Sequence, residues 1–403
     1  VVVTIVSGYS ISASVPSGAP AGSNLWEVVR EAVEFVNTVI SPALTGKHPL
    51  QQAVIDNIMV RKLEEIRNER GSGALKFGAS AIFAVSLAVS RAAGFVLYQP
   101  LYKRIATLAG NKKLIMPIPV SNVINEFTIH PVGSSSFDDA SLVTWNIFYN
   151  VKEVVRKEYG QFCVCNEVCH GGGISPKFKD VTDGLKLLNE AISSSRHSDK
   201  VVIGVDAAAS EFYELDKTYR PNFSGENNGF SQRVSGDALK DFYKSLVRDY
   251  NVASIEEPFD KDDCESYSKL TTEIGERVQI VGDEFLVTDP KRIEHAIKEK
   301  TCNTLLIKVK HLSSVTETIK AVKMVKEAGW GVILASHGSG ETDDTFVGPL
   351  AVGLGATQIN AGFYCKHERC SIYNELRTIE RMIGRGGHGR DFYVGGDFKT
   401  PSE

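Results

Sequence analysis

The chain has 403 residues, of which 42% are hydrophobic and 23% are charged, and its formal net charge is -4. This composition is typical of a globular protein with a sizeable core. The 45 basic residues do not exceed the 49 acidic ones, which argues against a protein that works mainly on nucleic acid. No apolar run approaches the roughly 20 residues that cross a bilayer, so we expect no membrane span.

The first 117 residues predict a small α+β domain. A run with antiparallel character at the N-terminus is followed by amphipathic helices, expected over Leu25–Ile40, Pro49–Arg67 and Ala79–Ala92. The sequence MPIP at 116–119 interrupts this pattern. We therefore predict a cap domain over residues 1–117 and a second domain over residues 118–403. The chain begins with valine, so we expect that its true start is missing.

The seven cysteines are an odd number, and Cys163 and Cys165 are too close together for a disulfide framework. A reducing compartment is therefore favoured, and we expect the cytoplasm. Cys163, Cys165, Cys169 and His170 could in principle hold zinc. Their spacing, C-x-C-x3-C-H, is not one that structural zinc sites use. Ordinary reduced thiols are the favoured interpretation.

After residue 200, short β-branched runs alternate with longer helical patterns. The expected strands are Val201–Val205, Ala253–Ile255, Val278–Val281, Thr304–Val309, Gly331–Ala335 and Thr357–Ile359. The expected helices are Asp237–Tyr250, Cys264–Ile274, Pro290–Lys300, Ser313–Ala328, Asp343–Gly353 and Lys366–Arg381. Short apolar runs that are each followed by a helix are typical of buried parallel strands. Six such units in series predict an α/β fold with a (β/α) barrel of the TIM type rather than an open sheet.

Nearly every expected strand ends at a polar or ionisable residue. These residues are Asp206, Glu256, Asp283, Lys308, His337 and Asn360. Barrel enzymes build their active sites from the carboxyl ends of several strands, where the loops surround one mouth. Each residue alone could equally be a helix cap or a solvated loop residue. Three carboxylates, a lysine and a histidine in successive units favour a site.

The residue types at these strand ends indicate one kind of chemistry. Carboxylates of Asp206, Glu256 and Asp283 would form an oxygen cage that suits Mg²⁺. Lys308 could act as a base if its pKa falls, which a nearby divalent cation and partial burial would favour. Together they predict abstraction of a proton next to a carboxylate. The alternative for Lys308 is a lysine that extends from a strand end into solvent.

Longer sequence segments resemble the enolase family, the glycolytic 2-phosphoglycerate dehydratases. The matching segments are VPSGA at 15–19, GASAIFAVSLAVSRAA at 78–93, NEF at 125–127, IGVDAAASEFY at 203–213, SIEEPFDKDD at 254–263, QIVGDEFLVTDPKRI at 279–293, LLIKV at 305–309, GWGVILASHGSGETDDTF at 329–346 and KHERCSIYNELRTIE at 366–380. The resemblance covers nearly the whole chain and is densest from 201 to 380.

The resemblance implies a C-terminal TIM-type (β/α)8 barrel of enolase type that begins ββαα, a smaller α+β N-terminal cap, Mg²⁺ dependence, a small phospho-acid substrate and a homodimer. By position it implies that Asp206, Glu256 and Asp283 bind the metal and that Lys308 is the general base. The implied roles of the remaining residues are catalysis for Glu126 and His337 and substrate binding for His337 and Ser339.

Several positions depart from the family pattern. Gly171, preceded by His170, replaces an acidic residue; Asn360 replaces a second lysine; Gly338 replaces a phosphate-binding arginine; and Pro20 replaces a serine of a metal-binding loop. A glycine-rich loop with a histidine before NEF and a strand with a DSRGNPT segment are also absent. A positioned acid alone is worth about 10²–10⁴ in rate.

These departures predict an enolase-family protein that retains the metal cage and base but has weak or lost catalysis and a structural or interaction role. The alternative is an active Mg²⁺-dependent enolase. A Rossmann-type binding protein built around the GGG at 171–173 is less favoured, because no convincing strand precedes those glycines.

Overall fold

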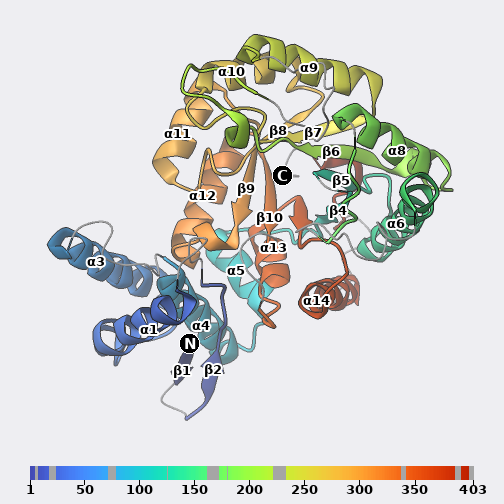
Figure 1. Ribbon diagram of the computed structural model, residues 1–403. Coiled ribbons are helices and arrows are strands. Elements are labelled where there is room, and N and C mark those ends of the chain that lie inside the picture. The colour runs from blue at the N-terminus through green and yellow to red at the C-terminus, as the bar shows by residue number, and fades with distance from the viewer. Residues whose placement is uncertain are drawn as a thin grey trace.

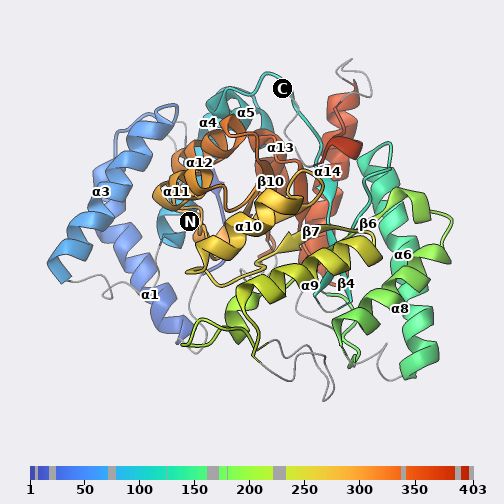
Figure 2. The same cartoon turned by 90° about the horizontal axis from the view of Figure 1, so that it is seen from above.

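The computed structural model describes residues 1–4, 8–17, 24–70, 79–124, 126–160, 172–178, 180–220, 233–336, 342–385 and 392–398. An N-terminal region of helices and a short β-ribbon packs against one side of a barrel that is ringed by helices (Figure 1). From above, α1 and α3 lie on the side of the molecule opposite α6 and α8 (Figure 2). The chain is thus an α/β barrel with a smaller cap, as the sequence predicts.

The N-terminal region confirms the expected antiparallel start and amphipathic helices. Its elements are β1 (Val2–Thr4), β2 (Ser10–Ser12), α1 (Leu25–Phe35), a π-helical turn (Val36–Ile40), α2 (Ser41–Leu44), α3 (Gln52–Arg70), α4 (Ser80–Val96) and α5 (Leu101–Ala109). Helix α4 is buried along most of its length because it lies between the other helices of the cap and the barrel. The sequence analysis missed α5.

The barrel strands are β3 (Ile118–Pro119), β4 (Ser121–Ile124), β5 (Phe127–His130), β6 (Val202–Asp206), β7 (Val252–Glu256), β8 (Gln279–Gly282), β9 (Thr304–Lys308), β10 (Gly331–Ala335) and β11 (Gln358–Asn360). The helices around them are α6 (Phe137–Tyr159), α8 (Val181–Ser193), α9 (Gly236–Asp249), α10 (Cys264–Ile274), α11 (Pro290–Glu299), α12 (Val315–Glu327), α13 (Val347–Leu354) and α14 (His367–Arg385). Short 3-10 turns are Ser198–Lys200, Ala209–Phe212, Val309–His311 and Gly395–Asp397. The six strands expected after residue 200 are all present, within one or two residues of their expected bounds.

The sheet closes through β3 and β4, which together form one continuous barrel strand. The strand order is β3-β11-β10-β9-β8-β7-β6-β5-β4, and only Val120 separates β3 from β4. The amide of Val120 donates to the carbonyl of Ile359 at 2.8 Å, so the strand formed by β3 and β4 pairs with β11 as well as with β5. Strand β5 runs antiparallel to both of its neighbours, and α6 and α8 follow it. This arrangement gives the ββαα start that the resemblance implied.

The cap is attached to the barrel at the beginning of α12. The carboxylate of Asp56, on α3, accepts hydrogen bonds from the backbone amide of Thr316 at 3.0 Å and from its hydroxyl at 2.6 Å. The hydroxyl of Ser86, on α4, accepts from the amide of Val315 at 2.9 Å. Two amides in the first turn of a barrel helix are therefore satisfied by side chains of the cap.

A second attachment joins the cap to the loop after β10. The guanidinium of Arg91 donates to both carboxylate oxygens of Asp344, at 2.7 and 2.5 Å, and to the carbonyl of Ser12 at 2.8 Å. The side chains are 24% and 10% exposed, so solvent screens this pair less than a surface pair.

We expect Arg91→Ala to lower the free energy of unfolding by about 1–3 kcal/mol, because the largely buried Asp344 carboxylate loses its charged partner and, among the described residues, keeps only the amides of Ser14 and Phe346. Urea unfolding measures the change. The matched control is Arg156→Ala, whose partner Glu153 lies at 2.6 Å with both side chains more than 40% exposed. That change should cost at most about 1 kcal/mol, and equal losses in the two variants would contradict the argument.

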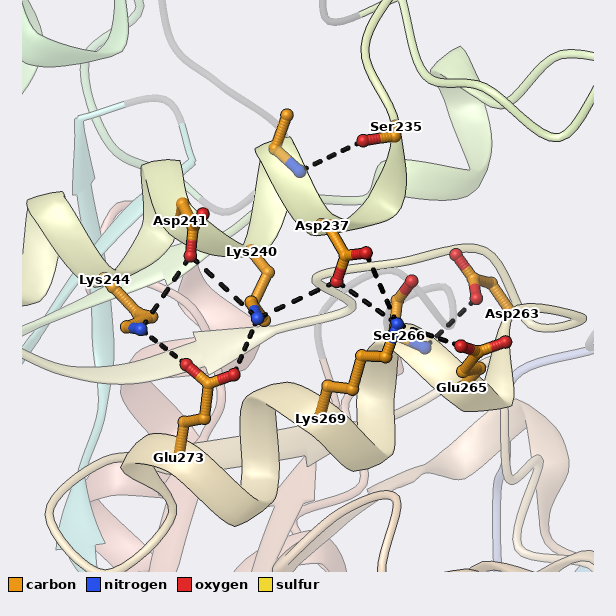
Figure 3. Close-up of polar contacts among 11 residues, drawn as sticks. Ser235, Asp237, Lys240, Asp241, Lys244, Asp263, Glu265, Ser266, Lys269 and Glu273 are labelled. Carbon is orange, nitrogen blue, oxygen red and sulfur yellow. Dashed lines mark hydrogen bonds and ion pairs between the residues drawn. The ribbon is translucent and has the colours of Figure 1, made fainter.

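A ladder of ion pairs links the exposed sides of α9 and α10 (Figure 3). The carboxylate of Glu273 accepts from Lys240 at 2.6 Å and also from Lys244. Lys269 pairs with Asp237 at 3.2 Å and with Glu265 at 2.9 Å. Most of these side chains are exposed, so each pair contributes little to stability.

Buried polar side chains occupy the amino-terminal end of the barrel. The ring of His130, the last residue of β5, contacts Gln358 through Nδ1 at 2.9 Å and Thr128 through Nε2 at 3.0 Å. Gln358 in turn donates to Gln279 at 3.0 Å. Burial lowers the pKa of His130 to about 4, from an ordinary value of 6.5.

The lowered pKa of His130 predicts that the folded protein loses stability in acid. Between pH 6.5 and 4 the unfolded chain binds a proton at His130 and the folded chain does not. The free energy of unfolding should therefore decrease as the pH falls through this range, by up to about 3 kcal/mol. Urea unfolding at neutral pH and near pH 4.5 measures it, with His130→Gln as the reference. If the parent and His130→Gln lose the same stability, the loss does not come from His130.

Among the described residues no single helix is long and apolar enough to cross a membrane, although α4 and α5 together, bent by 103°, meet that test of length and composition.

Candidate active site

Two of the predicted metal ligands lie side by side at the carboxyl ends of β6 and β7. Asp206 and Glu256 are direct partners in the parallel register of these strands. Both line a narrow space inside the barrel, together with Asn360 of β11. Burial raises the pKa of Asp206 to about 6, and the carboxylate of Asp283 adds to the shift. Burial and then the charge of Asp206 raise the pKa of Glu256 well above its ordinary value.

Asp283 and Lys308 form an ion pair next to these two carboxylates. Asp283 follows β8, Lys308 ends β9, and the ammonium of Lys308 donates to Oδ2 of Asp283. The side chains are 2% and 15% exposed respectively. Oδ1 of Asp283 is buried and has no hydrogen-bond partner in the part of the chain that the structure describes. The structure thus brings the predicted base and all three predicted ligands to one end of the barrel.

The carboxylates around Lys308 oppose the effect of burial on its pKa. Burial alone would lower it, but the charges of Glu256, Asp283 and Asp206 together raise it above the ordinary value. The pKa is raised because three carboxylates surround the ammonium, and the decrease expected beside a divalent cation stays a prediction. Lys308 can release its proton readily only if a cation neutralises those carboxylates.

The donor set fits a hard divalent cation. The described residues include no group of three His, Cys, Asp or Glu side chains already arranged around a common point as a metal site. However, Asp206, Glu256 and Asp283 supply only oxygen donors, and all three have raised pKa values. Carboxylates that repel one another and a buried oxygen without a partner are features that a bound Mg²⁺ would stabilise. We conclude that these residues suit Mg²⁺ in composition.

Glu126 lies beside this cluster, in the turn between β4 and β5. Its backbone carbonyl accepts a hydrogen bond from the amide of Asp206 at 2.9 Å. Its side chain is exposed at the edge of the barrel mouth, and partial desolvation, with a smaller contribution from Glu211, raises its pKa. The structure therefore brings the predicted acidic residue next to a predicted metal ligand.

Asn360 occupies the position where the resemblance calls for a second lysine. It lies in the same row of the sheet as Lys308, with Ala335 between them in register. Asn360 is buried, and its side-chain oxygen accepts from the amide of Gly362 at 3.0 Å. This side of the mouth thus carries a neutral amide that is bonded to the backbone.

Other residues of the sequence analysis lie outside the described part of the chain. These are Pro20, Cys163, Cys165, Cys169, His170, Gly171, His337, Gly338 and Ser339. The roles expected for His337 and Ser339 stay predictions.

The sequence analysis missed Glu257, the second acid of the EEP segment. Its carboxylate is buried and accepts from the amides of Asp283 at 2.8 Å and Phe285 at 3.2 Å. Burial and the charge of Asp283 raise its pKa to about 7. The only signal in the sequence is the pair of adjacent acids after an apolar strand, and that pattern does not say which acid faces inward.

Family models match both parts of this chain. The model described as the enolase C-terminal TIM barrel domain matches residues 113–400, and the enolase N-terminal domain matches residues 1–105. The chain belongs to the enolase family. The division between these matches falls close to residue 117, where the sequence analysis placed the boundary, and the boundary itself stays a prediction.

Relatives of this enolase-family chain are similar over its whole length. Enolase 2 of Hevea brasiliensis is 49% identical and enolase of Solanum lycopersicum is 48% identical, each over 100% of this chain and 94% of the relative. Enolase of Eimeria tenella is 40% identical over 97% of this chain and 92% of the relative. The first two alignments span 425 positions against 403 residues here, so these relatives contain residues that this chain lacks.

Proposed function

We propose that the chain is an active enolase that dehydrates 2-phosphoglycerate to phosphoenolpyruvate with Mg²⁺. The observation that carries this proposal is the meeting of Lys308 with Asp206, Glu256 and Asp283 at the carboxyl ends of neighbouring barrel strands. The names and the identity of the relatives support the same activity. Fold alone would not support it, because barrels of this kind host many reactions.

The roles of the residues follow from their positions. Lys308 would remove the proton from the carbon next to the substrate carboxylate and hold it on Nζ. Asp206, Glu256 and Asp283 would hold Mg²⁺, which when bound neutralises the negative charge that develops on that carboxylate. Glu126, whose pKa is raised, would donate a proton from the exposed edge of the mouth, so that the hydroxyl leaves as water. His337 and Ser339 would contact the substrate.

A weakly active protein with a structural or interaction role is the second candidate, and Asn360 favours it. In the proposed reaction a cation at this position would offset substrate charge, and a buried amide bonded to Gly362 cannot. Loss of such a contact reduces the stabilisation of the transition state without disturbing the metal cage.

One experiment separates the two candidates. Purified chain is assayed for phosphoenolpyruvate formation from 2-phosphoglycerate, and Mg²⁺ binding is measured by calorimetry on the same sample. Turnover within the usual enzyme range of about 1–10³ s⁻¹ supports the active enolase. Clear Mg²⁺ binding with turnover several powers of ten lower supports the second candidate. Absence of both contradicts the proposed site.

We further propose that the chain is a homodimer and that it works in the cytoplasm, in glycolysis. The support for both is the family and the names of the relatives. Light scattering after size exclusion tests the dimer, with a molar mass near twice the 44.0 kDa of one chain as the expected result.

A further inference from the structure

Glu257 has an unusual backbone conformation for its residue type. Its φ angle is +49°, in the left-handed region that residues with a Cβ rarely adopt. It directly follows Glu256 at the end of β7, and it is only 5% exposed. Non-glycine residues in this conformation persist where the surrounding structure holds them, and they cluster at functional sites.

The contacts of Glu257 connect three strand ends. Its amide donates to the carbonyl of Val281 in β8 at 3.1 Å, and its carbonyl accepts from the amide of Ala209, after β6, at 3.0 Å. Its Oε1 accepts from the amides of Asp283 and Phe285. Glu257, directly after β7, is thus hydrogen-bonded to the backbone that follows β6 on one side and to the backbone of β8 and of Asp283 on the other.

A second strained residue lies in the same arrangement. Ala208 has a φ angle of +42°, and its amide donates to Oδ1 of Asp206 at 3.2 Å. The amide of Ala207 donates to the carbonyl of Glu256 at 2.9 Å. Left-handed residues therefore follow both strands, Ala208 two positions after Asp206 and Glu257 one position after Glu256.

We propose that Glu257 is a positioning residue that fixes the backbone at Asp283 and so directs the Asp283 carboxylate toward Lys308 and the cation site. The inference rests on the proposed function, because the direction of the Asp283 carboxylate matters to the reaction only if that carboxylate binds the cation beside Lys308. Groups that orient metal ligands through hydrogen bonds typically change metal affinity by about 10–100-fold when they are removed. A residue that only stabilised the loop would change the free energy of unfolding and leave Mg²⁺ affinity in the folded protein unchanged.

The chain offers a matched control in Glu380. Its carboxylate is also buried, at 8% exposure, and also accepts from two backbone amides, those of Phe137 at 2.6 Å and Asp138 at 3.2 Å. These amides begin α6, which follows the end of β5 at the amino-terminal side of the barrel. Glu380 therefore makes the same bonds away from the candidate site.

The test compares Mg²⁺ affinity by calorimetry in the full chain and its variants. Glu257→Leu should weaken binding by roughly 10–100-fold, because neither amide keeps its acceptor. Glu257→Gln should stay within about threefold, since the amide oxygen can accept both bonds. Glu380→Leu should lower stability and leave affinity within about threefold. Parent-like affinity in Glu257→Leu, or an equal loss in Glu257→Gln, would overturn the proposal.

Amide hydrogen exchange at Asp283 and Phe285, without metal, provides a second readout. These amides should exchange at least about tenfold faster in Glu257→Leu than in the parent and Glu257→Gln. If Glu257→Leu does not fold, the amides of the parent and Glu257→Gln should still be protected, and rapid exchange in the parent would refute the proposal. A parent that binds no Mg²⁺ would contradict the proposed function, whereas the exchange result decides the role of Glu257 separately.

Discussion

Replacement of Lys308 by alanine is expected to lower the formation of phosphoenolpyruvate by at least about 10²–10⁴-fold, the usual contribution of a positioned base. Lys308 is the one amine that the structure places against Asp283, in the part of the chain that it describes. The loss should appear in kcat rather than in KM, since the base acts in the transition state. A coupled assay at saturating Mg²⁺ measures both constants.

The matched control is Lys310→Ala. Lys310 lies two residues further along the chain, is 30% exposed and pairs with Glu284 at 2.5 Å. This variant should keep turnover within about threefold of the parent, as is usual for surface substitutions. Unchanged turnover in Lys308→Ala would show that the activity belongs to another protein in the sample.

Asp283→Asn should weaken Mg²⁺ binding by at least about a hundredfold, because affinity in oxygen cages follows the number of ligand charges. It should also abolish turnover, since the base loses its partner at the same time. Isothermal calorimetry measures the affinity. Asp139→Asn is the control, because Asp139 also pairs with a lysine, Lys200 at 3.1 Å, near the amino-terminal end of β6.

The same titration should depend on pH. Asp206 has a pKa raised to about 6, and the pKa of Glu256 is also raised, so protons compete with the cation near neutral pH. Mg²⁺ affinity of the parent should be higher at pH 8 than at pH 6. Identical affinities at the two values, or a parent-like affinity in Asp283→Asn, would place the cation elsewhere.

The positions of the four central residues could be predicted because they follow from topology. Once the alternation of strands and helices indicates a barrel, the carboxyl ends of parallel strands must meet at one mouth, and Asp206, Glu256, Asp283 and Lys308 all end or follow strands. Their meeting requires no knowledge of side-chain packing. Glu126 could be placed only through the resemblance.

The remaining features depend on details that a sequence pattern does not encode. The antiparallel direction of β5 is set by pairing with β4 and β6, and a four-residue strand carries no signal of direction. The raised pKa of Lys308 is a sum of opposing contributions whose sign depends on distances. The role of Glu257 depends on one left-handed residue and two backbone amides.

The hydrogen bonds from Asp56 and Ser86 to the start of α12 bear on how the protein can be divided. A fragment that contains only residues 118–403 would expose two amides of that helix and the apolar surface that α4 now covers. During synthesis the N-terminal cap leaves the ribosome first, so the barrel can pack against it as the later strands and helices emerge. Residues 118–403 expressed alone should therefore aggregate. Co-expression with residues 1–117 as a separate chain should restore a barrel that does not aggregate.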